Sequence, residues 1–109
     1  MKVDLYFKNA LVGCLTSSDD KFNFILNQEG YESVKQFPSV VFMVEIEKLS
    51  SGEYDSVPKF FMNEFVNNIK QRKDILQSAG VEAGDDDMTV LYKYAALEQN
   101  DFKFHLKQG

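Results

Sequence analysis

Apolar and polar residues alternate along the first 26 positions, with the period of two that is typical of half-buried β-strands. This alternation predicts strands over 2–8, 11–16 and 22–26. Between them, Asn9 and the Ser-Ser-Asp-Asp segment at 17–20 are residue types that favour tight turns, and asparagine tolerates positive φ. The pattern therefore predicts a three-stranded antiparallel meander at the start of the chain.

Two further strands are expected, one in the middle of the chain and one at its end. Alternation over 40–46 predicts a fourth strand, and the polar stretch 27–36 before it has room for one helical turn. At the end of the chain, three apolar residues alternate with three polar ones: Phe102, Phe104 and Leu106 with Lys103, His105 and Lys107. We expect this last strand to rejoin the sheet, with His105 facing solvent. Gly13 suits a bulge or a close approach of another segment to the backbone.

The period changes to a helical one after Pro58, whose fixed φ and missing N–H suit the first turn of a helix. Apolar residues then recur every three to four positions, namely Phe61, Met62, Phe65, Val66 and Ile69. Asn67-Asn68 is a candidate break, after which a second helix is predicted over 69–79, with Gly80 as its left-handed C-terminal residue. The acidic triplet 85–87 predicts the N-terminus of a third helix.

These elements predict one α+β domain over residues 1–109. Its N-terminal antiparallel meander has four to five strands, including the returning C-terminal strand, and packs against about three helices. The composition agrees, because 44% hydrophobic and 27% charged residues are ordinary for a globular domain that needs no disulfide or metal.

Charge and hydropathy exclude several classes of function. With 12 basic and 17 acidic residues the net charge is −5, which argues against direct binding of nucleic acid. The longest apolar run, 40–44, is too short to cross a membrane, and the first residues lack the pattern of a signal peptide. We therefore expect a cytoplasmic protein.

No residue pattern indicates catalysis, a cofactor or a metal. Cys14 is the single cysteine and is expected to be a small buried apolar residue, and His105 is the single histidine. The six glycines are scattered singly, so no phosphate-binding loop is predicted, and the acidic triplet at 85–87 lacks the spacing of a calcium-binding loop. We expect a protein that is not an enzyme and binds no cofactor.

Two surface features are candidates for contact with a partner. Neighbouring residues on a helix lie about 100° apart, so Phe60 falls at the edge of the stripe that contains Phe61. It either completes the core or, together with Tyr54, presents an aromatic surface to a partner. The basic cluster Lys70, Arg72 and Lys73 is either a solvated helix face or a contact patch for an acidic partner.

The order of these motifs resembles the N-terminal subdomain of the HipA family of toxin kinases. That family opens with a strand, a turn and a V-G-x-L motif, which is similar to residues 5–16, followed by an F-x-Y strand, similar to 22–26. Its P-L-S-L-S-L-P segment is loosely similar to 38–44, its F-F-x-x-L-L-P helix to 60–67, and its D-x-x-x-L-L helix to 86–92.

The chain also departs from the family pattern. Asn67 replaces the proline of L-L-P, the proline that closes P-L-S-L-S-L-P is missing, and Ala96-Leu97-Glu98-Gln99 replaces a glycine-containing motif. The stand-alone form of this subdomain resembles the HipS antitoxins of three-component HipBST toxin–antitoxin systems.

The resemblance implies an antitoxin without catalytic activity of its own. It implies that the chain binds and inhibits a HipT-like Ser/Thr kinase toxin, in a ternary complex with a HipB-like helix-turn-helix DNA-binding protein. We predict that the segment Tyr54–Asn63 makes the contact, with an aromatic inserted near the kinase cleft, and the candidate residues are Tyr54, Pro58, Phe60, Phe61 and Asn63. Glu82 and the triplet 85–87 would meet a basic kinase face.

Two other interpretations remain open. The domain is a scaffold that joins the kinase to its DNA-binding partner without inhibiting it, or it is an unrelated acidic inhibitor or immunity protein. Against the latter, lysines are interleaved with the acidic residues along the chain.

Overall fold

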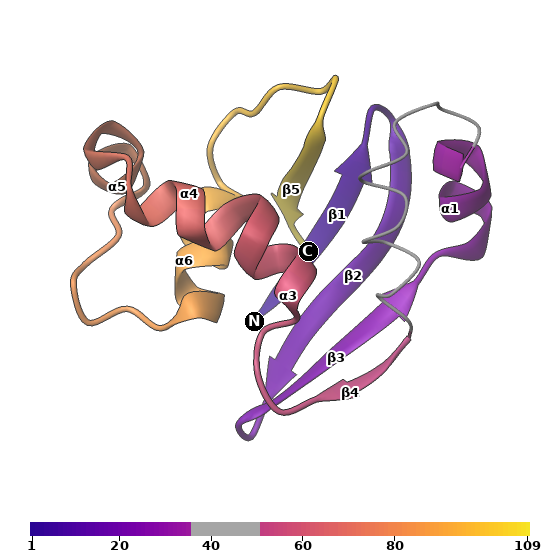
Figure 1. Ribbon diagram of the computed structural model, residues 1–109, viewed down its shortest axis with the longest axis horizontal. Coiled ribbons are helices and arrows are strands. Elements are labelled where there is room, and N and C mark those ends of the chain that lie inside the picture. Colours follow the sequence, from indigo (N-terminus) through magenta and orange to yellow (C-terminus); the bar gives the residue numbers. More distant parts are fainter. Residues whose placement is uncertain (36–50) are drawn as a thin grey trace.

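In the part of the chain that the structure describes, the first strand lies between two others in a five-stranded antiparallel sheet with the order β4-β3-β2-β1-β5 (Figure 1). The computed structural model describes residues 1–35 and 51–109. The strands are β1 (Lys2–Phe7), β2 (Ala10–Ser18), β3 (Lys21–Leu26), β4 (Gly52–Tyr54) and β5 (Phe104–Gln108). The helices of the described residues are α1 (Gln28–Lys35), α3 (Lys59–Phe61), the π-helical turn η1 (Met62–Val66), α4 (Asn67–Lys70), α5 (Lys73–Ala79) and α6 (Asp87–Tyr94). The expected α+β class and the meander β1-β2-β3 are confirmed.

Both hairpin turns depend on residues with positive φ. Asp19 and Asp20 adopt φ of 50° and 63°, and positive φ at both central residues suits a two-residue turn to the twist of the strands it joins. The turn predicted at Asn9 is present, and the neighbouring Lys8 carries the positive φ, at 54°.

Gly13 lies where a neighbouring ring approaches the backbone. Leu5 pairs with Gly13 while Tyr6 pairs with Leu11, so β2 has one extra residue beside the glycine. A Cβ added at Gly13 would lie 2.5 Å from Cζ of Phe24, which is too close for any side chain. The expected bulge and close approach are therefore both present at this position.

One face of the sheet forms the core. Residues that pair across the strands share a face, and the fully buried positions Val3, Leu15 and Phe24 form one such row. Leu5 and Leu106 form a second row on the same face. Helices from α3 to α6 lie together toward one end of the sheet in Figure 1, while α1 lies at the other end beside β2.

The middle of the chain differs from expectation in two ways. The polar stretch after β3 forms the full helix α1, which Asn27 begins by accepting a hydrogen bond at Oδ1 from the backbone N–H of Gly30. Residues 52–54, for which no strand was predicted, form β4 and pair with β3. The fourth strand expected over 40–46 lies outside the described residues.

The helical stretch after Pro58 is not interrupted at Asn67-Asn68, the candidate break. Pro58 precedes the first turn with φ of −57°, as expected, and helical φ and ψ continue through Asn67. The break comes at Arg72, whose φ of −115° and ψ of 98° are extended, so the second helix is α5 and begins at Lys73. Gly80 ends α5 with a φ of 72°, which confirms the predicted left-handed residue.

The acidic triplet begins α6, as predicted, and Asp86 is its N-cap. Oδ1 of Asp86 accepts a hydrogen bond from the backbone N–H of Thr89 at 2.8 Å. The carboxylate thereby satisfies one of the N–H groups that a helix leaves without a partner in its first turn.

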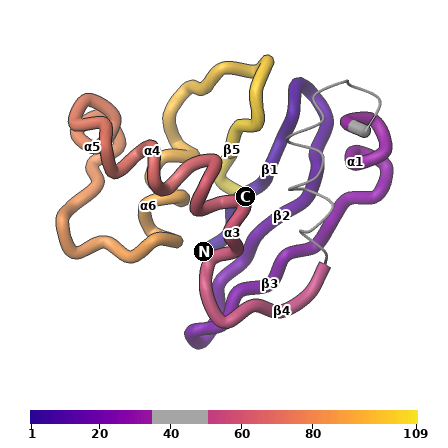
Figure 2. The backbone as a smooth tube through the Cα atoms, in the orientation of Figure 1, coloured from indigo at the N-terminus to yellow at the C-terminus, as the bar shows by residue number. Residues whose placement is uncertain are grey.

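The returning strand β5 pairs with β1 and places the two ends of the described chain side by side (Figure 2). The backbone N–H of Gly109 donates to the carbonyl of Lys2 at 3.1 Å. Two details of the expected strand are wrong. Phe102 precedes β5 and is 78% exposed, while His105 is only 3% exposed because it stacks on Tyr6 with ring centroids 5.7 Å apart.

Candidate functional site

The segment Tyr54–Asn63, predicted to contact a partner, is partly core and partly surface. Pro58 is buried, and Phe60 and Phe61 are 4% and 0% exposed. Tyr54 is half-buried at the end of β4, and Asn63 is exposed on the π-helical turn. Of the five candidate residues, Tyr54 and Asn63 are therefore the two that reach the surface.

Phe60 completes the core, which decides between the two alternatives that the sequence left open. Its ring lies 5.5 Å from that of Phe61 and 5.3 Å from that of Phe104, both edge to face. It also lies 6.5 Å from the ring of Phe65. Phe104 comes from β5, more than 40 positions later, so the sequence did not place this ring beside Phe60. Phe60 is unavailable for insertion into a partner while the domain is folded.

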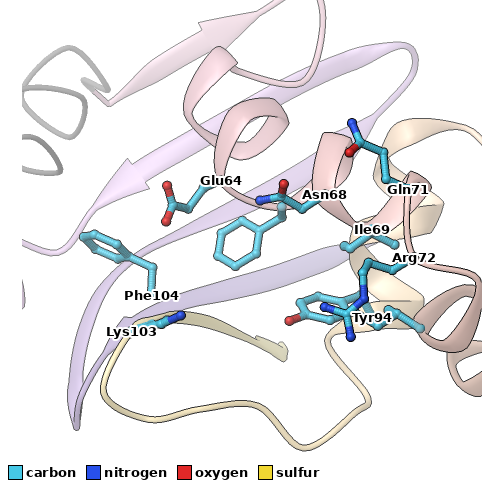
Figure 3. A pocket seen from close by; sticks show the side chains of 10 residues that line it. Glu64, Asn68, Ile69, Gln71, Arg72, Tyr94, Lys103 and Phe104 are labelled. Atoms are coloured by element: carbon cyan, nitrogen blue, oxygen red, sulfur yellow. The ribbon is translucent and has the colours of Figure 1, made fainter.

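A hollow of about 430 Å³ lies beside this aromatic cluster (Figure 3). The helical stretch η1–α4, the start of α5, the end of α6 and the turn before β5 surround it. Its lining combines apolar and polar side chains: Phe65, Ile69, Ile75, Tyr94 and Phe104 with Glu64, Asn68, Gln71, Arg72 and Lys103. Phe65, Ile69 and Phe104 are nearly buried, so the polar side chains supply much of the accessible lining.

The charges in the hollow are arranged at two ends. Figure 3 shows the Arg72 side chain beside the ring of Tyr94, with Glu64 at the opposite end near Phe104. Nε and Nη2 of Arg72 donate to the two carboxylate oxygens of Asp74 at 3.1 Å and 2.9 Å. This pairing lowers the pKa of Asp74 and raises that of Arg72.

Tyr94 supplies a phenol to the floor of the hollow. Burial raises the pKa of Tyr94, an effect that the nearby Arg72 partly opposes. The hydroxyl therefore stays protonated near neutral pH and can donate a hydrogen bond to an acceptor in the hollow.

The turn before β5 carries an exposed aromatic ring, that of Phe102. Among the aromatic side chains that the structure describes, Phe102 alone is exposed. Oδ1 of Asn100 accepts from the backbone N–H of Phe102 at 2.9 Å, and Nδ1 of His105 lies 2.9 Å from the carbonyl of Lys103. Sequence reasoning missed this residue by assigning it to the strand, although Asn100 is a typical turn residue.

The acidic residues around the start of α6 are mostly engaged within the domain. Asp85 accepts from Lys93 at 2.7 Å, and Asp87 accepts from Lys70 at 2.8 Å. A hydrogen bond from the Glu82 N–H lowers the pKa of Asp85, and hydrogen bonds from the side chain and the backbone N–H of Thr89 lower that of Asp86. The sequence had offered this cluster as a surface for a basic partner, whereas the structure uses it to connect α6 with α4 and the preceding loop.

The three residues of the predicted basic cluster have different surroundings in the structure. Lys70 pairs with α6, Arg72 lines the hollow, and Lys73 is exposed at the start of α5. Cys14 is half-buried and pairs in register with Asp4 and Ile25, on the sheet face opposite the core, so the expectation of a buried position is wrong.

Within residues 1–35 and 51–109, no three His, Cys, Asp or Glu side chains gather in a way that would hold a metal ion. The helices described over the same ranges include none with the length and apolar character needed to cross a membrane. Comparisons with protein-family models, with curated proteins and with solved structures found no match to this chain.

Proposed function

We propose that this protein is a cytoplasmic antitoxin of the HipS type. It binds a HipA-like Ser/Thr kinase toxin that lacks its own N-terminal subdomain, and it inhibits that kinase from the position a fused subdomain would occupy. A HipB-like DNA-binding protein completes the complex. The proposal comes from the motif resemblance, and the fold and the accessible surface of the domain support it.

The observation that best supports the proposal is that residues from three motif segments pack together around one side chain, the ring of Phe24. Gly13 belongs to the V-G-x-L segment, Phe24 to the F-x-Y strand, and Phe61 to the aromatic pair. The Phe24 ring covers the backbone of Gly13 and lies 5.8 Å from the ring of Phe61. The motifs that carry the resemblance are thus parts of a single packing unit, which supports treating them as one inherited subdomain.

The contact surface follows from what the core leaves exposed. Phe60 and Phe61 are buried in the core, whereas Tyr54 and Asn63 reach the surface at the two ends of the predicted segment. Phe102 adds an exposed aromatic, the residue type that most often anchors protein–protein interfaces. A detached subdomain has to replace its lost covalent tether with affinity, so we expect an interface of about 1,200–2,000 Å².

The direct test is a kinase assay with two purified proteins. We expect the chain to bind a HipA-like kinase that lacks its N-terminal subdomain, and to suppress autophosphorylation at a stoichiometric ratio. The DNA-binding partner is omitted, because inhibition in its absence separates an antitoxin from a scaffold. Binding without inhibition would favour the scaffold, and the absence of measurable binding would overturn the proposal.

The contact surface is tested with matched variants of the surface residues. Tyr54→Ala and Asn63→Ala alter the predicted segment, and Gln77→Ala alters an exposed position on α5 as a control. We expect the first two to weaken inhibition of the kinase while the control does not. Phe60→Ala is unsuitable for this purpose, because loss of the ring would disturb the core.

A further inference from the structure

The exposed serines of residues 1–35 and 51–109 differ in how their side chains are held. Ser18 ends β2, Ser33 lies on α1 and Ser78 lies on α5. The Oγ of Ser51 accepts a hydrogen bond from a backbone N–H of β3 at 2.8 Å. Within the same ranges, Ser56 is the exposed serine that lies outside helices and strands and whose Oγ makes no hydrogen bond. Its hydroxyl is therefore the most accessible of this group.

The loop that carries Ser56 joins β4 to α3 and is anchored on both sides. Before it, Tyr54 is half-buried against the core, and after it, Val57 is only 7% exposed. Asp55 forms an ion pair with Lys21 at the start of β3, which connects the loop to the β2–β3 hairpin (Figure 1). Ser56 thus lies on a bend whose position is set by its neighbours, while its own side chain is exposed.

This arrangement suits the acceptor of a phosphoryl group. A Ser/Thr kinase holds the acceptor hydroxyl close to the γ-phosphorus of ATP and takes up the hydroxyl proton with an aspartate. The acceptor has to be reachable and free of competing hydrogen bonds, as Ser56 is in the described part of the chain. A bend that is already fixed also loses less conformational entropy when a kinase cleft holds it.

Ser56 also belongs to the segment Tyr54–Asn63, which is predicted to contact the kinase. We infer that Ser56 is a phosphorylation site for the HipA-like kinase, an inference that rests on the proposed function. Because Ser56 would occupy the acceptor site of the kinase, it would exclude other acceptors from that site. Transfer to this chain is therefore compatible with inhibition of kinase autophosphorylation.

The transfer needs MgATP, which the kinase binds, and no other reactant. The Oγ of Ser56 forms a bond to the γ-phosphorus, and the bond from that phosphorus to the β–γ bridging oxygen breaks. ADP leaves with the electrons of the broken bond, and the hydroxyl proton passes to the aspartate of the kinase.

The test combines the full chain with a HipA-like kinase that lacks its N-terminal subdomain. Calorimetry without nucleotide measures complex formation, and phosphopeptide mapping of the whole chain locates the label after addition of MgATP labelled at the γ-phosphate. We expect label on Ser56, and none when the catalytic aspartate of the kinase is replaced by asparagine. Equal labelling by that kinase variant would come from another enzyme and would overturn the inference.

Matched variants assign the label to one hydroxyl. Ser56→Ala should lose the label, whereas Ser56→Thr keeps a hydroxyl and should retain it. Ser78→Ala, at an exposed position of α5, is the control and should be labelled as the parent is. Substitution at these exposed positions should leave folding unchanged.

The outcomes separate this inference from the proposed function. A chain that binds and inhibits the kinase while Ser56 stays unlabelled would overturn the inference alone. Label confined to any other residue would do the same. Absence of binding would overturn both the inference and the proposed function.

Discussion

The side chain of Gln99 pairs with the backbone of Leu106 as a neighbouring strand would. Its Oε1 accepts from the N–H of Leu106 at 2.8 Å, and its Nε2 donates to the carbonyl of Leu106 at 3.1 Å. Nε2 also reaches the carbonyl of Tyr94 at 3.1 Å, which connects the end of α6 to the outer side of β5. An edge strand offers unpaired backbone groups to other chains, and this amide occupies such a pair at the centre of β5.

We therefore predict that Gln99→Ala destabilises the domain and promotes self-association. Loss of the amide leaves the backbone groups of Leu106 without their partner, which should lower the free energy of unfolding by about 1–3 kcal/mol. Urea unfolding measures the first effect and size-exclusion chromatography across a concentration series measures the second. Gln77→Ala, at an exposed position of α5, is the control, and equal behaviour of the two variants would refute the role of Gln99.

The close approach of Phe24 to Gly13 leads us to predict that an alanine at position 13 destabilises the domain. In Gly13→Ala the new Cβ would also lie 2.6 Å from the backbone oxygen of Ile25, which cannot move without disturbing the pairing of β2 with β3. We expect a loss of about 1–3 kcal/mol in unfolding free energy, as for other overpacked sites. Gly84→Ala is the matched control, because nothing lies within 4 Å of a Cβ built there. Thermal unfolding of both variants would show the difference.

Substitutions of Phe60 and Phe102 should distinguish an effect on the stability of the domain from an effect on partner binding. Phe60→Ala removes a buried ring and should cost about 3–5 kcal/mol of unfolding free energy. Phe102→Ala alters an exposed ring and should stay within about 0.5 kcal/mol of the parent protein. If Phe102 anchors the proposed kinase contact, its removal should weaken binding by about tenfold or more, as measured by calorimetry. Unchanged affinity for Phe102→Ala would remove this ring from the interface.

The N-cap of α6 predicts a specific dependence on pH. The hydrogen bonds from Thr89 lower the pKa of Asp86 in the folded state, so the carboxylate stabilises the domain above its unfolded pKa. That contribution is lost as the pH falls below about 4 and the carboxylate takes up a proton. Asp86→Asn keeps a capping oxygen and loses the charge, so it should be less stable than the parent near pH 7, with the difference narrowing toward about pH 2.

Urea unfolding at a series of pH values checks this prediction. Glu98→Gln removes one carboxylate from an exposed site and is the control for the change in net charge. A stability difference between Asp86→Asn and the parent that is the same at both ends of the pH range would contradict the assignment.

The two periodicities, together with turn and cap residues, predicted the α+β class, the meander, the residue that ends α5 and the start of α6. These features depend on residues close in sequence, such as Gly80 with its left-handed backbone and Asp86 with its cap on Thr89. β4 was not predicted, because a strand of three residues has no measurable period and depends on the neighbouring β3. Of the residues predicted to contact a partner, Tyr54 and Asn63 lie at the surface, and the hollow was not anticipated.

The sequence by itself determined which stretches are strands or helices over most of the described chain, because backbone preferences and turn residues act over a few positions. Tertiary structure alone decided the surroundings of individual side chains. Phe60 became core because Phe104 arrives from β5, and His105 became buried because Tyr6 lies beside it. Arg72 and Lys103 share a hollow although about 30 positions separate them. Whether a ring or a charge serves the core or the surface depends on contacts between distant segments, which no local pattern contains.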